Sequence, residues 1–175
     1  MFDEEWFAEF YRRRYPAILA YGVRRVGPEA ARDLAAEVFL VVWRRGLQLP
    51  EAEELPWLYT TARKIAANHL RSRDRRTALT RRVAAVLAAG VAEQLDPMTS
   101  VDAGVDVRAA LATLAPKDQE ALLLVEWEGL DQATAAEVVG CRPGTFKVRL
   151  HRARKRLAAA LGEPASASRL VRTNS

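Results

Sequence analysis

The chain has 175 residues, half of them hydrophobic, so it is long enough to fold around one large core or two small ones. Its 27 Lys and Arg outnumber its 22 Asp and Glu, and the net charge of +5 favours a polyanionic partner. A single cysteine, Cys141, excludes an internal disulfide and indicates a reducing compartment. No Cys/His cluster has metal-ligand spacing, no catalytic constellation or cofactor motif is present, and neither a signal peptide nor a run of roughly 18 apolar residues is found. We therefore expect a cytoplasmic protein without metal, cofactor or membrane insertion.

Two helices are predicted in the first 45 residues. Apolar residues at helical spacing predict a helix or helix pair over 3–25, with a bend or break at Pro16. Gly27-Pro28 ends this segment and begins the next, because Pro is favoured at the first helical position. The next helix is predicted over 29–45.

A third helix, over 57–76, is predicted to follow a proline-containing loop over 46–56. It carries the first basic stretch: Arg63, Lys64, Arg71, Arg73, Arg75 and Arg76. Trp57 and Tyr59 precede these cations, and aromatic rings beside cations suit unpaired nucleic-acid bases. The alternative is that both rings belong to the hydrophobic core.

Residues 77–104, rich in Ala and small polar residues, predict a linker. Helical spacing of Val83, Val86, Leu87 and Val91 indicates that part of this linker is a helix. Four further helices are expected over 106–113, 117–128, 132–139 and 143–161, followed by a tail without periodicity. The sequence therefore predicts an all-α protein with two small domains, 1–76 and 105–161, a linker over 77–104 and a mobile tail over 162–175.

Residues 130–157 predict a helix-turn-helix. Asp131 suits the N-cap of its first helix, Gly140 suits the left-handed C-cap, and Pro143 suits the first position of the second helix. The second helix has an apolar stripe, and its other faces are basic and contain no acidic residue. A basic helix after a short joint favours insertion into a DNA major groove. The alternative is a solvated basic face on a bundle helix.

Three segments in this order resemble the extracytoplasmic function (ECF) RNA polymerase sigma factors. DLAAEVFLVVWRR (33–45) is similar to the segment that contacts polymerase, and LPWLYTTARKIAANHLRSRDRR (55–76) to the segment that melts and reads the −10 element. LATLAPKDQEALLLVEWEGL with the following helix-turn-helix is similar to the region that reads the −35 element.

The resemblance implies a binding protein and assigns roles to residues. Asp33 and Glu37 would contact the β′ clamp helices of core RNA polymerase, and the C-terminal domain would meet the β flap. The −10 strand would be held by Trp57, Tyr59, Lys64, Asn68, Arg71 and Arg75. The −35 duplex would be met by Arg142, Thr145, Lys147, Arg149, His151 and Arg152. Family members are commonly controlled by an anti-sigma factor, which the resemblance therefore also implies.

Two other functions are compatible with parts of the sequence. A stand-alone helix-turn-helix regulator would explain 130–157 and leave the pattern over 33–76 without a role. A helical enzyme or adaptor that binds RNA or acidic proteins would explain the basic helices, but no nucleophile or phosphate-binding loop supports an enzyme.

Overall fold

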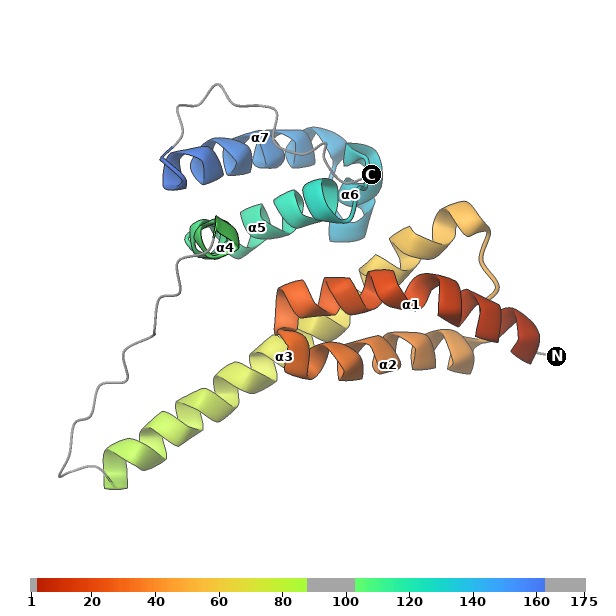
Figure 1. Ribbon diagram of the computed structural model, residues 1–175, viewed down its shortest axis with the longest axis horizontal. Helices are drawn as coiled ribbons and strands as arrows, with labels where there is room; N and C mark the ends of the chain where they lie inside the picture. Colours follow the sequence, from red (N-terminus) through yellow and green to blue (C-terminus); the bar gives the residue numbers. More distant parts are fainter. Residues whose placement is uncertain (1–2, 88–102, 163–175) are drawn as a thin grey trace. The chain divides into compact units, whose positions relative to one another are not determined.

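The computed structural model describes residues 3–87 and 103–162, with side chains over 3–80 and 107–162. Every regular element in these ranges is a helix, which confirms the predicted all-α fold (Figure 1). The chain divides into two compact units, Met1–Leu95 and Asp96–Ser175, which are described separately.

The N-terminal unit is built from α1 (Glu4–Val26), α2 (Pro28–Arg45) and α3 (Glu51–Leu87). The Asp3 side chain caps α1 by accepting the backbone N–H groups of Glu5 and Trp6. The break or bend expected at Pro16 does not interrupt α1, which continues as one helix to Val26. Gly27, with φ +88°, turns the chain between α1 and α2.

The core of this unit lies between the three helices and is made of large apolar side chains. Fully buried members from all three helices are Phe10, Ile18, Tyr21, Leu34, Val38, Val42 and Leu58. The helices α1 and α2 lie close together at Gly22, where an added Cβ would lie 3.1 Å from the Cα of Ala31. An alanine or a larger residue at position 22 would therefore separate the two helices.

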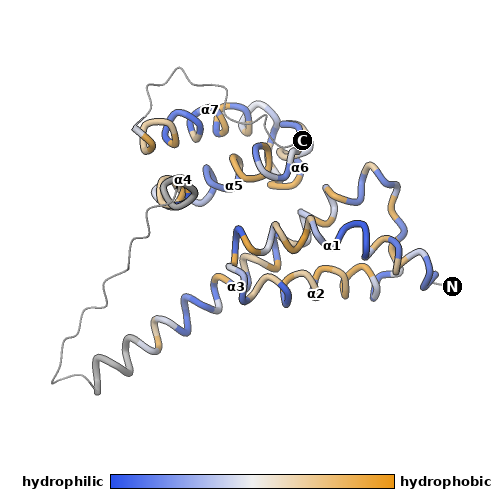
Figure 2. The backbone as a smooth tube through the Cα atoms, viewed as in Figure 1, coloured by the Kyte–Doolittle hydropathy of each residue, from blue (hydrophilic) through white to orange (hydrophobic). Residues whose placement is uncertain are grey.

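The third helix differs from the prediction at both ends. It begins at Glu51, inside the segment 46–56 that was expected to be a loop, and it contains Pro56. Three glutamates in its first turn favour this start because they oppose the positive end of the helix dipole. The helix then continues to Leu87, so residues 77–87 of the expected linker are helical. This agrees with the helix that the spacing of Val83, Val86 and Leu87 indicates. The part of α3 just before this extension, residues 71–76, is hydrophilic (Figure 2).

Residues 88–102, including Val91 of the expected apolar stripe, lie outside the described residues, as do residues 163–175.

The C-terminal unit contains α4 (Ala103–Ala112), α5 (Pro116–Leu122), the π-helical turn η1 (Leu123–Trp127), α6 (Gln132–Val139) and α7 (Pro143–Ala160). The single helix expected over 117–128 is thus α5 followed by η1, where the N–H of Glu128 donates to the carbonyl of Leu123 at 3.0 Å. Trp127, the last residue of η1, is 40% exposed.

The predicted helix-turn-helix is confirmed as α6 and α7. Asp131 accepts the N–H groups of Ala133 and Thr134, each at 2.9 Å, and Gly140 adopts the left-handed conformation with φ +71°. Helix α7 packs against α4, α5 and α6. Phe146, Leu150 and Ala153 are its buried stripe, so its basic faces point away from the core.

Candidate nucleic-acid interface

The cations of α7 divide into two groups by their contacts. Arg154 donates to Glu126 of η1 through Nε at 2.8 Å, and Arg156 pairs with Asp118 of α5. These two ion pairs hold α7 against the preceding helices. In the described part of the unit, no acidic partner contacts Arg142, Lys147, Arg152 or Lys155, all of which are exposed. The second group is therefore free to meet an external anion.

A groove of about 540 Å³ runs beside the N-terminal half of α7. Its lining residues are Asp118, Gly144, Thr145, Val148, Arg149, Arg152 and Arg156. It brings together three of the predicted −35 residues, namely Thr145, Arg149 and Arg152. Arg149 is half-buried, and its Nη1 lies 4.0 Å from the Sγ of Cys141 in the turn. Sequence reasoning missed Asp118 and Arg156, because their pairing joins helices 38 residues apart.

The other predicted −35 residues lie around the same helix. Lys147 and His151 are exposed one turn apart, and Arg142 is exposed at the N-cap position. Five of the six predicted residues thus belong to α7, and Arg142 is its N-cap residue.

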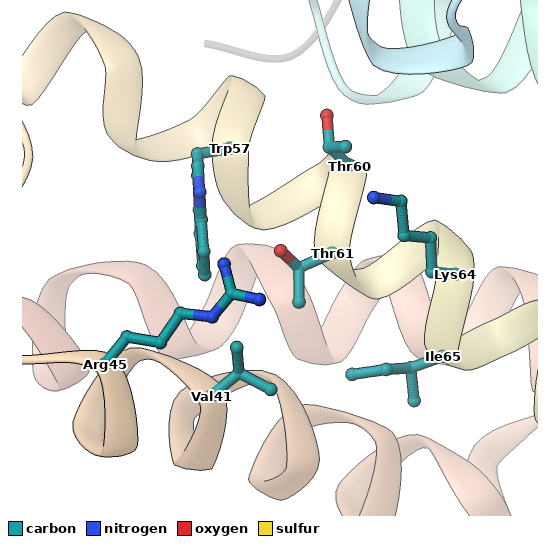
Figure 3. Close-up of a pocket in the computed structure, with 7 residues that line it drawn as sticks. All are labelled: Val41, Arg45, Trp57, Thr60, Thr61, Lys64 and Ile65. Carbon is teal, nitrogen blue, oxygen red and sulfur yellow. The ribbon is translucent and has the colours of Figure 1, made fainter. Parts of the chain in front are cut away.

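A second groove, of about 270 Å³, lies between α2 and α3 in the N-terminal unit (Figure 3). It is lined by Val41, Arg45, Trp57, Thr60, Thr61, Lys64 and Ile65. Trp57 is half-buried and Lys64 is exposed, so both predicted −10 residues are accessible here. Sequence reasoning did not assign Arg45, which comes from the helix predicted to bind polymerase.

The other predicted −10 residues continue along α3. Lys64, Asn68, Arg71 and Arg75 are exposed and recur at spacings of four, three and four, which places them on one helical face. Arg71 donates to the side-chain oxygen of Asn68, and Arg75 donates to Ser72 Oγ at 3.0 Å. These polar contacts orient the side chains along the helix surface.

The prediction that Tyr59 contacts the −10 strand does not fit its position in the structure. Its ring is 2% exposed and stacks on Tyr21 of α1 with 5.4 Å between ring centroids. Tyr59 shares its helical face with the buried residues Ala62 and Ala66, so it points into the core. The alternative considered for the two aromatic residues is therefore right for Tyr59, which has no exposed surface to offer a base.

Asp33 and Glu37 lie one turn apart on α2, and both are exposed. The adjoining face of the helix, with Leu34 and Val38, is buried. Glu37 Oε1 lies 2.8 Å from the Nε2 of His69 on α3. This contact, which local sequence patterns do not reveal, joins the acidic face of α2 to the basic helix.

Comparisons with known proteins match both units. Residues 10–76 match the family model described as Sigma-70 region 2, and residues 105–157 match Sigma-70, region 4. The chain is similar to RNA polymerase sigma factor CarQ of Myxococcus xanthus, with 30% identity over 163 residues that cover 91% of each protein. It is also similar to the ECF RNA polymerase sigma factor BldN of Streptomyces coelicolor, with 32% identity over 93% of this chain and 63% of the relative. The chain belongs to the ECF sigma factors.

A solved structure supports this assignment. The sigma factor is similar to RpoE of Bartonella quintana, solved in complex with the anti-sigma factor NepR, with a TM-score of 0.67, 26% identity and coverage of 93% of this chain and 98% of that one. CnrH, solved with the cytosolic domain of CnrY, has a TM-score of 0.62 over 91% of this chain and 90% of that one; at 21% identity it supports the fold alone. In the described parts of the sigma factor, no helix is long and apolar enough to span a membrane. Sigma factors as a class direct RNA polymerase to promoters and are regulatory proteins rather than enzymes.

Proposed function

We propose that this sigma factor docks on core RNA polymerase through α2, holds the melted −10 strand along α3 and reads the −35 duplex with α7. The observation that carries the proposal is an exposed cationic helix face in each of the two units that match sigma regions 2 and 4. The protein itself catalyses no reaction, and it works in the cytoplasm with the polymerase. The two domains proposed for these roles are 1–76 and 105–161.

Docking would use Asp33 and Glu37 against the β′ clamp helices, while the C-terminal unit meets the β flap. Reversing both acids to Lys should abolish most co-purification with core polymerase, because the acidic face of α2 would become cationic. The matched control reverses Glu5 and Glu9, which are exposed at the same spacing on α1. Equal retention of core by both double variants would contradict docking through α2.

Reading of the −35 element would use the half-buried Arg149 and the unpaired cations of α7. Arg149→Ala should weaken duplex binding by roughly 1–3 kcal/mol if the guanidinium makes a bidentate base contact. Arg152→Ala should make the binding constant depend less steeply on salt concentration, by the amount expected for the loss of about one phosphate contact. Arg154→Ala is the control, because Arg154 already pairs with Glu126. An unchanged salt dependence in Arg152→Ala would remove that residue from the interface.

Control by an anti-sigma factor is the remaining part of the proposal. Its support is the similarity to RpoE of Bartonella quintana, which was solved with the anti-sigma factor NepR. Affinity capture from the native cell with the full chain as bait, with and without competing core polymerase, should recover a protein that core displaces.

The decisive experiment is run-off transcription with purified core polymerase on a library of genomic fragments. Discrete transcripts that require the sigma factor are expected. A stand-alone regulator would instead bind its operator without core and would produce no transcript with it. That outcome would contradict the proposal as a whole.

A further inference from the structure

His69 of α3 contacts one of the two acids on the exposed face of α2. Its Nε2 lies 2.8 Å from the Oε1 of Glu37. The His69 side chain is 23% exposed, whereas that of Glu37 is 53% exposed. The histidine is therefore held between the two helices, while the carboxylate keeps about half of its surface for a second partner. His69 is the only histidine of the N-terminal unit.

The contact between His69 and Glu37 has two charge states. A neutral imidazole with its proton on Nε2 donates one hydrogen bond to Glu37 Oε1, and the pair keeps the full negative charge of the carboxylate. A protonated imidazole donates at the same place and adds a positive charge, so the pair becomes neutral overall. Histidine is the side chain that ordinarily changes between these two states near physiological pH.

Other charged groups lie on the neighbouring turns of the three packed helices. Asp33 is one turn before Glu37 on α2, and Arg73 is one turn after His69 on α3; both are exposed. Helix α1 packs against α2 and α3 and carries Arg24 and Arg25 in its last turn, where Arg25 lies over the Tyr21 ring at 3.6 Å from its centroid. Arginine and carboxylate side chains ordinarily keep their charges near neutral pH, so the charge at this place changes there through His69.

We propose that His69 is a positioning residue for polymerase docking and that it makes the docking depend on pH. Neutral His69 holds the Glu37 carboxylate at the surface of α2 with its charge intact, whereas protonated His69 cancels that charge. The affinity for core polymerase therefore falls as the pH falls. The inference rests on the proposed function, in which Asp33 and Glu37 face the polymerase. It adds a control that comes from α3, the helix proposed to hold the −10 strand.

The expected effect is that of one exposed ion pair. Asp33 remains available to the polymerase when His69 is protonated, so one of the two acidic contacts is lost and the other stays. An exposed charge pair changes an equilibrium constant by roughly twofold to fivefold. Protonation of His69 therefore tunes the affinity for core polymerase without abolishing it.

The test measures the affinity of the full chain for purified core polymerase, without promoter DNA, between about pH 6 and about pH 8. His69→Gln keeps a neutral donor toward Glu37 at every pH. The wild type and His69→Gln should bind core equally at about pH 8, whereas at about pH 6 the wild type should bind roughly twofold to fivefold more weakly. His69→Lys, which is cationic throughout this range, should bind more weakly than the wild type already at about pH 8. Comparing the variants at the same pH removes the titration of the polymerase itself.

Two acid-to-amide substitutions on α2 serve as matched controls. Glu37→Gln removes the carboxylate that His69 contacts, so in this background His69→Gln should not alter how core affinity depends on pH. Asp33→Asn removes the other exposed carboxylate and leaves the contact between His69 and Glu37 in place. In that background the difference between His69 and Gln at position 69 should therefore persist at about pH 6.

The outcomes separate this inference from the proposed function. The same dependence of core affinity on pH in the wild type and in His69→Gln would overturn the inference and leave docking through α2 intact. A difference that persists in the Glu37→Gln background would do the same, because His69 would then act through another group. If neither Asp33→Asn nor Glu37→Gln changed core affinity at about pH 8, docking through α2 would be contradicted, and the inference would fall with it.

Discussion

Glu54 shows how a single residue fixes the first turn of α3. Its carboxylate is 1% exposed, and it accepts from Arg13 Nη2 at 2.8 Å and from Arg14 Nε at 2.6 Å. A buried carboxylate is tolerated only when charged or polar groups replace its water. Two arginines of α1 therefore hold the first turn of α3 and, through it, the position of Trp57.

Glu54→Gln should destabilise the N-terminal unit by about 1.5–3 kcal/mol, because the single amide oxygen cannot replace both carboxylate oxygens. Arg13 then loses its counter-charge, and Arg14 keeps only the contact with Glu51 at 3.5 Å. Glu53→Gln is the matched control. Glu53 is exposed on the same turn, and its substitution should change the free energy of unfolding by less than about 0.5 kcal/mol. Urea unfolding of both variants checks this, and equal stabilities would show that the Glu54 cluster contributes little.

Asp131 gives the C-terminal unit a pH dependence. The Thr134 N–H and hydroxyl, together with the Ala133 N–H, lower the pKa of Asp131 below its ordinary value of 3.8. The folded protein thus binds this proton more weakly than the unfolded chain does. The contribution of the carboxylate to stability is complete above pH 3.8 and is lost as the pH falls through the lower folded value.

Asp131→Asn tests this dependence, because the amide oxygen still caps the helix but does not titrate. The wild-type protein should be the more stable of the two at neutral pH, and the difference should disappear in acid. Urea unfolding at a series of pH values measures it. A difference that stays constant from neutral pH to well below 3.8 would show that the carboxylate charge has no part in the cap.

At the scale of elements, the crossing of α1 and α2 depends on Gly22. Gly22→Ala should destabilise the N-terminal unit by about 1–3 kcal/mol, because the new Cβ would meet the backbone of Ala31 at 3.1 Å. Gly144→Ala is the same change in the first turn of α7, where no atom lies within 4 Å of the added Cβ. It should stabilise the C-terminal unit by up to roughly 1 kcal/mol through helix propensity. Thermal unfolding of both variants distinguishes packing from propensity, and a stabilised Gly22→Ala would contradict the close crossing.

Elements with local signals were predictable from the sequence. Asp131, Gly140 and Pro143 specify the ends of α6 and α7 through contacts within a few residues. The start of α3 was not predictable in this way, because Pro50 and Pro56 read as a loop. What stabilises its first turn is Glu54, which meets arginines 40 and 41 residues earlier in the chain.

The candidate site residues were likewise predictable where the signal is local and not where it depends on contacts distant in the sequence. The cations on α3 and α7 could be identified because they recur at helical spacing. This spacing places them on the helix face away from the apolar stripe, and therefore on the protein surface. The contact of Glu37 with His69 spans 32 residues, so no local pattern reports it. The sequence also did not reveal that Tyr59 is buried while Trp57 is accessible. Both are aromatic and two positions apart, and only the packing of Tyr59 on Tyr21 decides which ring is buried.

At the scale of the whole molecule, the two units have separate cores and contact different promoter elements in the proposed function. We predict that they unfold independently, because each buries its own apolar side chains. Because the two units belong to one chain, each would raise the effective concentration of the other at the promoter. This is the expected arrangement for a protein that must meet −10 and −35 elements at the same time.

The four tryptophans allow this independence to be measured in the intact chain. Trp6, Trp43 and Trp57 belong to the N-terminal unit and Trp127 to the C-terminal unit, so in a Trp127→Phe background fluorescence reports the N-terminal unit alone. In that background Glu54→Gln should lower the urea midpoint, whereas Asp131→Asn should leave the free energy of unfolding unchanged within about 0.5 kcal/mol. If Asp131→Asn shifted the N-terminal transition as much as it destabilises its own unit, the two units would fold as one body. The sigma factor would then hold α3 and α7, the helices proposed to bind DNA, at a fixed spacing.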